Sequence, residues 1–308
     1  MSPGLLLQVL VTGLAAGAAY GLVGIGIALV YRLTGVLQLA HGDLVGGATF
    51  FVLAVVVGSA PVTRSNVGFW PLLGACLAAV AMAAAAGAGL YLGLIRPFFH
   101  RRSSVGWVAV VVAVAFAVQG VLAASFPREG YVFPDLFGPV TRRPPLALGG
   151  GASIPVRTFW LLAVAVVVAL VAARWLARST PGRAMSAIAD DPDAAEVVGL
   201  PIDRLIAAGF ALATALAAVA GIVVAPAAPL TPQTGLLLGL KGIAAAMVAR
   251  FGSPVRVLAA GLGLGVLEAA VTSLSIGPGP AWRDLTPLLV GVAAVAIRPP
   301  RVATDAVE

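Results

Sequence analysis

The sequence predicts an all-α bundle of about eight to ten membrane-spanning helices, formed by residues 1–308 as a single domain. Of the 308 residues, 60% are hydrophobic and only 10% are charged, whereas an ordinary soluble domain has about 25% charged residues. The charge-poor stretches are also long, and about 20 apolar residues are enough for a helix to cross a ~30 Å hydrocarbon layer. These observations exclude the soluble enzyme classes.

Nine charge-poor runs follow one another along the chain, and each is a candidate crossing. They are residues 5–31, 36–57, 69–95, 105–124, 158–177, 205–226, 235–249, 257–275 and 282–297. The first run has no basic segment before it and is too long for the core of a secretory signal, so we expect an uncleaved span. Lys241 and Arg250 interrupt the stretch 235–275, a pattern that a broken or re-entrant helix also produces.

Arginine-rich segments predict the orientation of the bundle. Residues 96–102 and 174–204 concentrate arginine between apolar runs, and such segments stay on the cytoplasmic side of a membrane. Alternation of nine spans then places the N-terminus outside and the tail 298–308 inside. The net charge of +7 is therefore interpreted as a topology signal and not as a nucleic-acid surface, which needs a continuous basic face. The tryptophans at or near run ends, typical of an interfacial aromatic belt, are Trp70, Trp107, Trp160, Trp175 and Trp282.

Residues 125–157 form the long loop that this orientation places outside. The loop contains six prolines and five glycines, which disfavour regular structure. It also contains the aromatic residues Phe126, Tyr131, Phe133 and Phe137. Two interpretations stay open, a simple tether and a docking surface for an external partner.

Glycines at four-residue spacing predict close contacts between helices. In a membrane, small residues at this spacing let two helix backbones approach each other, because lipid supplies no hydrophobic driving force between helices. The glycines that follow this spacing are Gly13, Gly17 and Gly21, Gly42 and Gly46, Gly235 and Gly239, and Gly261 and Gly265.

The predicted cytoplasmic segment 179–205 contains two short helices with defined ends. Thr180 is placed to cap the first and Asp191 to cap the second, each followed by a proline, because the missing amide donor of proline costs nothing in a first helical turn. Gly199 ends the second helix. A lipid-bound helix would have a basic polar face, whereas this pair has small apolar side chains that suit a protein groove. An ordinary interhelical loop is the alternative interpretation.

Several motifs resemble those of permeases from bacterial ABC importers. Asp193-Ala194-Ala195 followed by Gly199 resembles their Glu-Ala-Ala-x-x-x-Gly loop, with Asp in place of the first Glu. The branched-chain amino acid (LivH/LivM) type of permease is similar over most of residues 8–295. The motifs similar to that type are the run from Thr180-Pro181-Gly182-Arg183-Ala184 to Gly199, Leu39-Ala40-His41-Gly42-Asp43, and Gly239-Leu240-Lys241 followed downstream by Phe251-Gly252-Ser253-Pro254.

The resemblance implies a multi-pass permease of the bacterial inner membrane that moves branched-chain or related amino acids. Its partners would be a second permease, identical or paralogous, two cytoplasmic ATPase subunits that use ATP and Mg²⁺, and an extracytoplasmic substrate-binding protein. Members of the type usually have a glycine pair where this chain has Ala249-Arg250, and Arg256 is added after it. This departure leaves open a ligand such as urea or a short amide. The residues expected to couple to the ATPase are Gly182, Arg183, Ala184, Ala187, Asp193, Ala194, Ala195 and Gly199.

Four ionisable residues within the apolar runs are candidate functional groups. His41, Asp43, Lys241 and Glu268 lie in or at the ends of these runs, where an Asp or Lys at a helix centre costs roughly 2.5–3.5 kcal/mol. We expect them to face the bundle interior, either as fixed pairs between helices or as a polar lining of the substrate path. Asp43 is one candidate partner for Lys241 and Glu268 is the other, while His41 has the further alternative of a place at the membrane interface.

The sequence predicts no catalytic, metal or cofactor site in this chain itself. Two histidines and one cysteine, His41, His100 and Cys76, are too dispersed to hold a metal, and no glycine-rich loop ends in Gly-Lys-Ser/Thr to hold ATP phosphates. An ion-coupled secondary transporter is a rival interpretation because it also uses midplane charges, but it has no need of a capped cytoplasmic helix pair. A membrane enzyme would need a nucleophile and base clustered at one depth, and the sequence offers none.

Overall fold

The described part of the chain is a helical bundle with one very small sheet. The computed structural model describes residues 3–57, 67–100, 104–127, 130–136, 146–147, 153–227, 229–274 and 281–297. Its helices are α1 (Pro3–Thr34), α2 (His41–Val56), α3 (Phe69–Gly89), α4 (Arg96–His100), α5 (Ser104–Ser125), α7 (Val156–Arg178), α8 (Thr180–Asp190), α9 (Pro192–Val197), α10 (Ile202–Val224), α11 (Thr234–Val248), α12 (Pro254–Ser273) and α13 (Ala281–Ile297). A π-helical segment, Leu90–Ile95, joins α3 to α4, and a 3₁₀ turn, Ala225–Ala227, follows α10. Strands β1 (Leu146–Ala147) and β2 (Ser153–Ile154) pair antiparallel.

Each of the nine predicted runs coincides with a helix, but the helices differ in length. Within the described residues, six helical stretches are long and apolar enough to cross a membrane. Helices α2, α11 and α13 have 16, 15 and 17 residues, and at a rise of 1.5 Å per residue they measure only about 22–26 Å. The stretch 235–275 is two separate helices, α11 and α12, joined by the turn 249–253.

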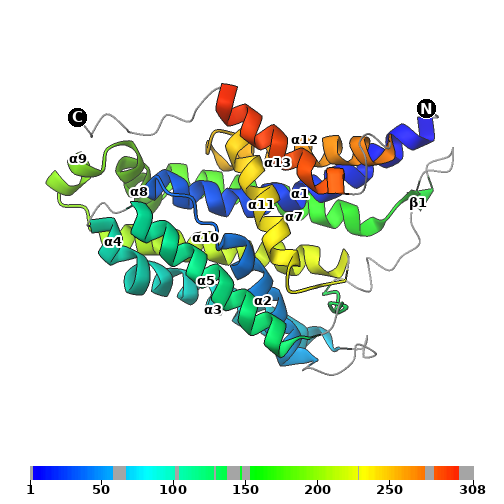
Figure 1. The fold of residues 1–308 in the computed structure, drawn as a ribbon, viewed down its shortest axis with the longest axis horizontal. Coiled ribbons are helices and arrows are strands. Elements are labelled where there is room, and N and C mark those ends of the chain that lie inside the picture. Colours follow the sequence, from blue (N-terminus) through cyan, green and yellow to red (C-terminus); the bar gives the residue numbers. More distant parts are fainter. Residues whose placement is uncertain are drawn as a thin grey trace.

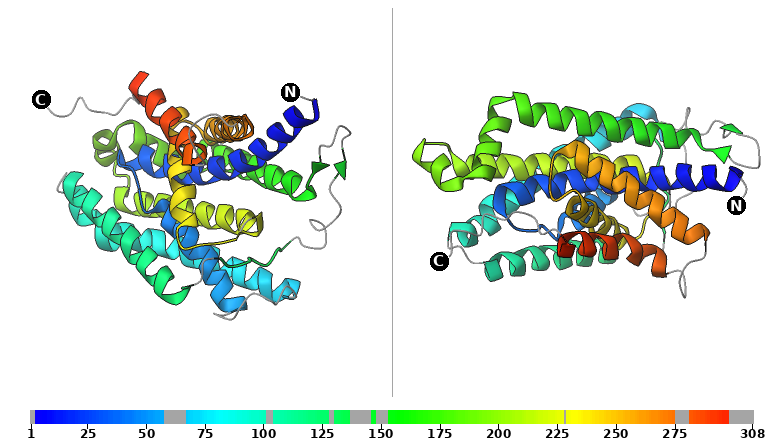
Figure 2. Two further views of the ribbon diagram at one scale, coloured as in Figure 1. Left: turned by 45° about the vertical axis from the view of Figure 1, so that its right-hand side comes forward. Right: turned by 90° about the horizontal axis from the view of Figure 1, so that it is seen from above.

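The long helices lie roughly along the longest axis of the molecule, with α1 near the centre (Figure 1). Helix α1 contacts α7, α10, α11 and α12, and 83% of its most apolar window is buried inside the bundle. Viewed from above, α12 lies across α1 (Figure 2). A chain that surrounds one of its own apolar helices in this way has the organisation of a polytopic membrane bundle.

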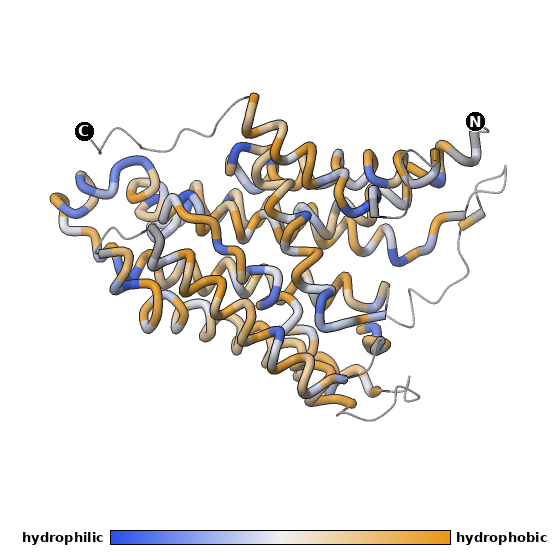
Figure 3. Tube along the Cα trace, in the orientation of Figure 1, coloured by the Kyte–Doolittle hydropathy of each residue, from blue (hydrophilic) through white to orange (hydrophobic). Residues whose placement is uncertain are grey.

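The ends of the bundle agree with the predicted relative placement of the segments. Helices α8 and α9 and the short helix α4 lie at one end, and α1 begins at the other (Figure 1). Hydrophilic residues gather at α8 and α9, whereas apolar residues dominate the long helices (Figure 3). The two arginine-rich segments therefore share one end, and the assignment of that end to the cytoplasm stays a prediction.

Two helix crossings depend on glycine, as the four-residue spacing predicts. Between α1 and α12, a Cβ atom added to Gly17 would lie 2.5 Å from the carbonyl oxygen of Gly261. Between the short helices α2 and α11, a Cβ atom on Gly235 would lie 2.5 Å from the carbonyl oxygen of Gly42. At both crossings the two helix backbones are in contact. A residue larger than glycine would force them apart.

The described part of the loop 125–157 is packed onto the bundle. The side chains of Phe126, Tyr131 and Phe133 are buried, and Tyr131 exchanges backbone hydrogen bonds of 2.9 and 2.8 Å with Leu230. These aromatic side chains therefore do not form an external docking surface, and this part of the loop is not a loose tether. Phe137 lies outside the described residues.

Candidate functional site: a capped helix pair and a buried ionic network

Side-chain caps fix the beginnings of α8 and α9. The hydroxyl oxygen of Ser179 accepts a hydrogen bond of 3.0 Å from the amide of Gly182, so the cap of α8 is Ser179 and the prediction of Thr180 is wrong. The reason is that the helix already includes Thr180, and the capping residue is the one before it. The carboxylate of Asp191 accepts a bond of 2.9 Å from the amide of Ala194, which confirms the predicted cap of α9.

The end of α9 is fixed by glycine. Gly199 has a φ of 80°, in the left-handed region that side chains disfavour. Its amide donates to the carbonyl of Glu196 at 2.9 Å, and the amide of Leu200 donates to that of Ala195 at 3.1 Å. These two bonds are the Schellman arrangement that closes a helix C-terminus, so the chain leaves α9 in a fixed direction and enters α10 directly after Pro201.

The predicted coupling residues divide into an inward and an outward group. Gly182 and Ala195 are buried, and a Cβ atom on Gly182 would lie 2.6 Å from the Cα of Leu176 in α7. Gly182 therefore packs α8 closely against α7, and the coupling role of Gly182 and Ala195 stays a prediction. The residues that stay accessible, with Ala184 half-buried and the others exposed, are Arg183, Ala184, Ala187, Asp193, Ala194 and Gly199.

The most exposed apolar residues of the pair were not among the predicted ones. Val197 and Val198, at the end of α9, are 88% and 74% exposed. The sequence does carry a signal for this exposure. Two adjacent valines stand in a polar segment, directly before the glycine that ends the helix. They form an apolar tip on an otherwise hydrophilic projection.

The helix pair is tied to the bundle through the first turn of α10. Asp203 accepts a hydrogen bond of 2.9 Å from the hydroxyl of Tyr91 and forms an ion pair of 2.7 Å with Arg96. Tyr91 lies in the π-helical segment and Arg96 begins α4. The residues that follow α9 are therefore linked directly to the irregular end of α3, a contact that sequence reasoning missed.

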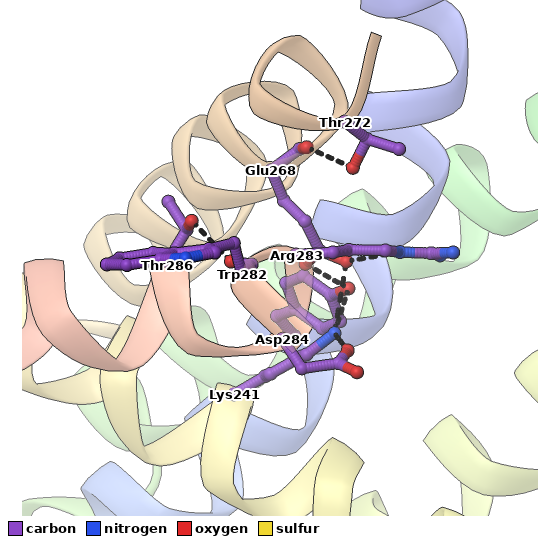
Figure 4. A network of polar contacts seen from close by, with 8 residues as sticks. Lys241, Glu268, Thr272, Trp282, Arg283, Asp284 and Thr286 are labelled. Carbon is purple, nitrogen blue, oxygen red and sulfur yellow. Dashed lines mark hydrogen bonds and ion pairs between the residues drawn. The ribbon is translucent and has the colours of Figure 1, made fainter. Parts of the chain in front are cut away.

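Lys241 and Glu268 pair inside the bundle, which is one of the two predicted alternatives. The ammonium of Lys241 lies 3.0 Å from Glu268 and 2.6 Å from Asp284. The Nε of Arg283 donates to the same Glu268 oxygen at 3.0 Å, and the hydroxyl of Tyr20 donates to the other oxygen at 2.7 Å. Figure 4 shows the labelled members of this network, which joins α11, α12 and α13.

Asp43 and His41 have other partners, so the predicted Asp43–Lys241 pair is wrong. One carboxylate oxygen of Asp43 accepts a hydrogen bond of 2.8 Å from Gln119 in α5. His41 is fully buried and lies 3.3 Å from Gln38, so it faces the bundle interior, and its depth in the membrane stays a prediction. The physical reason is that the two side chains point toward different helices. Asp43 is bonded to α5, whereas Lys241 is bonded to α12 and α13.

Sequence reasoning missed five members of these contacts: Tyr20, Gln38, Gln119, Arg283 and Asp284. Arg283 and Asp284 lie at the start of the last apolar run, 282–297, and are not among the predicted intramembrane groups. A basic and an acidic residue in the first turn of a membrane helix are a signal for such pairing, but their partners are 15 to 43 residues away.

The turn between α11 and α12 contains two residues with left-handed backbone conformations. Arg250 and Phe251 have φ values of 54° and 51°, in the left-handed region where glycine is the favoured residue. Phe251 is buried and stacks on Tyr31 with ring centroids 3.8 Å apart. The stacking holds Phe251 at a turn conformation that its backbone alone disfavours.

Comparisons with known proteins agree with this architecture. Residues 9–295 match the model of a family described as "Branched-chain amino acid transport system / permease component". The chain is 27% identical over 270 residues to the high-affinity branched-chain amino acid transport system permease protein LivH of Salmonella typhimurium, covering 85% of each chain. It is 26% identical over 270 residues to the permease protein BraD of Pseudomonas aeruginosa, again covering 85% of each.

One solved structure is similar in outline. It is titled PsaBC from Streptococcus pneumoniae in complex with Fab, has 14% sequence identity and a TM-score of 0.46, and the match covers 96% of this chain and 91% of that chain. The family match spans nearly the whole chain, including the capped helix pair and the buried network. This multi-pass membrane protein therefore belongs to the family of branched-chain amino acid transport system permease components.

Proposed function

We propose that this chain is a permease subunit of an ABC importer that moves branched-chain amino acids across the bacterial inner membrane. A second permease, identical or paralogous, completes the path. Two cytoplasmic ATPase subunits supply the energy from ATP and Mg²⁺, and an extracytoplasmic binding protein delivers the ligand. The chain itself catalyses no covalent change. The family, and the relatives named for branched-chain amino acid transport, support this assignment.

The observation that carries the proposal is the apolar tip of α9. Val197 and Val198 stand out from a hydrophilic projection at the arginine-rich end of the bundle. Exposed apolar side chains rimmed by polar ones are typical of a protein interaction site. An ATPase groove that accepts Val197 and Val198, with Arg183, Asp193 and Ala194 at its rim, accounts for the exposure of two apolar side chains on this projection.

The proposed mechanism transmits ATPase closure through the fixed ends of the helix pair. A push on α9 reaches α10 through the Schellman turn at Gly199, because only the four residues 198–201 separate α9 from α10. From Asp203 it reaches Tyr91 and Arg96 at the end of α3. ATP binding then favours one arrangement of the bundle over the other, because the docking contacts differ between the two.

Co-purification with the ATPase tests the proposal. The importer genes are expressed together, and the permease is isolated with a mild detergent from wild-type cells and from cells carrying Val197→Asp or Val198→Asp. A charge placed in an apolar groove must be desolvated, so both variants should retain much less ATPase than the wild type and should lose leucine uptake. Val132→Asp is the matched control, because Val132 is 60% exposed in the loop segment packed at the other end of α10.

Two results would contradict the proposal. One is full ATPase retention by both valine variants, and the other is leucine uptake against a gradient by the chain reconstituted alone in vesicles. The second result would favour the ion-coupled carrier. Uptake of urea or acetamide, but not of leucine, by the complete importer would keep the architecture and change the substrate.

A further inference from the structure

A groove with both polar and apolar lining residues lies between α1, α12 and α13, beside the buried ionic network. Its volume is about 240 Å³, below the roughly 300–1,000 Å³ of sites for drug-sized ligands and therefore suited to a smaller molecule. The residues that line it are Gln8, Val9, Thr12, Ala16, Gly265, Glu268, Ala269, Thr272, Ser273 and Arg283. Several of these side chains are polar although they lie on largely apolar helices.

Arg283 brings unused hydrogen-bond donors to this groove. Its Nε is bonded to Glu268, and within the described residues its two terminal nitrogens make no hydrogen bond or ion pair. Its side chain is 59% exposed and extends past Glu268 in Figure 4. The two terminal nitrogens of a guanidinium form a planar fork that matches the two oxygens of a carboxylate.

The network fixes Arg283 and leaves the groove close to neutral. Lys241 and Arg283 are balanced by Glu268 and Asp284, so a ligand with no net charge enters without a large electrostatic penalty. Glu268 is only 3% exposed in its side chain and already accepts from Lys241, Arg283 and Tyr20. It therefore acts as the anchor of Arg283 and has little capacity left for a ligand.

The end of α12 and the beginning of α13 favour one orientation of a zwitterion in the groove. Arg283 lies in the first turn of α13, and the N-terminal end of a helix attracts negative charge. α12 ends at Ser273, and the carbonyl groups of a helix C-terminus attract positive charge. A carboxylate at Arg283 and an ammonium near the end of α12 complement both ends at once.

From this geometry we propose that the groove is a substrate site in which Arg283 binds the carboxylate of the transported amino acid. The proposal rests on the proposed function and deepens it, because it assigns a residue to a ligand group that urea and simple amides lack. Thr272 and Ser273 line the ammonium side of the groove, and Glu268 and Lys241 are positioning residues.

Protection of a groove cysteine from a thiol reagent tests the site. The complete importer is prepared in membrane vesicles with Ser273→Cys, a nearly isosteric change at the groove, or with the control Leu274→Cys. Leu274 is 47% exposed and does not line the groove. The unmodified importer provides the blank for Cys76, which is buried. Leucine should slow labelling of S273C several-fold and leave L274C unchanged, whereas leucinamide, which has no carboxylate, should protect neither.

Substitutions at Arg283 then separate binding from structure. R283Q should abolish the protection by leucine, whereas R283K, which keeps a cation beside Glu268, should keep part of it and leave the unfolding temperature closer to that of the parent. R256Q removes an exposed arginine at the far end of α12 and should change nothing. Equal protection by leucine and leucinamide, or full protection in R283Q, would overturn the proposal.

The same assay distinguishes a failure of the proposed groove site from a failure of the proposed transport function. If the wild-type importer takes up leucine but S273C shows no leucine protection, the groove is not the site and the proposed function stands. If leucine protects S273C in an importer that does not transport leucine, the site stands as a carboxylate site and the proposed transport of branched-chain amino acids is wrong.

Discussion

Lys241 illustrates how single residues are stabilised within an apolar bundle. Its side chain is 9% exposed and has two carboxylate partners, Glu268 and Asp284. Removing charges from water costs several kcal/mol per ion, and this cost is offset only when geometry and additional hydrogen bonds are good. The hydroxyl of Tyr20 and the Nε of Arg283 supply those additional bonds to Glu268.

Removal of Lys241 should therefore destabilise the protein strongly. Lys241→Met leaves the half-exposed Asp284 without its cation and the buried Glu268 with Arg283 alone, so the loss should lie at the lower end of the about 3–5 kcal/mol that breaking a buried pair costs. We expect a loss of that order in the free energy of unfolding, measured at equilibrium in mixed detergent micelles. Arg256→Met, which removes an exposed arginine, should change the free energy of unfolding by less than about 0.5 kcal/mol.

A double-mutant cycle tests whether the lost unfolding free energy comes from the interaction between Lys241 and Glu268. Glu268→Gln combined with Lys241→Met removes both charges, so the double variant should lose less than the sum of the single variants, by about 1 kcal/mol or more. Additive losses would show that Lys241 and Glu268 do not stabilise each other.

At the scale of elements, the short helices α2 and α11 depend on their shared crossing. Gly42 and Gly46 of α2 face Gly235 and Gly239 of α11 at backbone contact. Neither helix is long enough to cross a ~30 Å layer upright, so each takes its place from its neighbours. The crossing also positions Lys241, which lies two residues beyond Gly239.

A single methyl group at this crossing should separate the two helices. A Cβ atom on Gly239 would lie 2.5 Å from the Cα of Gly42, and overpacking of this kind typically costs about 1–3 kcal/mol. Gly239→Ala should lower the free energy of unfolding by that amount and reduce leucine uptake.

Gly74 provides the matched control for that change. It lies in α3 with no atom near the position of an added Cβ, and alanine is a better helix former than glycine by roughly 1 kcal/mol. Gly74→Ala should therefore be neutral or stabilising. Equal effects of G74A and G239A would mean that the α2–α11 crossing tolerates a larger separation than the contacts indicate.

The whole molecule has one polar end and one end capped by its own loop. Helices α4, α8 and α9 gather at the first end (Figure 1), and the segment around Tyr131 packs against the second through Leu230. Arginine on short loops favours the cytoplasmic side. The predicted orientation therefore places Val197 inside the cell and Val132 outside.

Labelling from one side of the membrane tests this orientation. In intact cells expressing the chain without its ATPase, a membrane-impermeant maleimide should label Val132→Cys and not Val197→Cys, and both should be labelled after permeabilisation. Both valines are largely exposed, at 60% and 88%, so access is decided by the membrane. The reverse pattern would invert the orientation and remove the proposed ATPase contact.

The sequence by itself determined the class of the molecule, the positions of its long apolar helices, the glycine contacts and the capped helix pair. These features follow from local composition and spacing. The length of an apolar run predicts a membrane span, and glycine at every fourth residue predicts a helix face that packs closely against another helix. Asp191 and Gly199 fix the two ends of α9. Local signals also identified Lys241 and Glu268 as buried groups, because charge within an apolar run must face inward.

Only the tertiary structure decided the partners of the buried groups and which residues face outward. Lys241 had two candidate carboxylates, and the directions of α11 and α12 selected Glu268 while Asp43 faced Gln119 in α5. The same packing buried Gly182 and Ala195 and left Val197 and Val198 exposed. The physical reason is that a partner lies across the bundle, up to 248 residues away in the chain, and its distance depends on how helices cross, which local sequence does not encode.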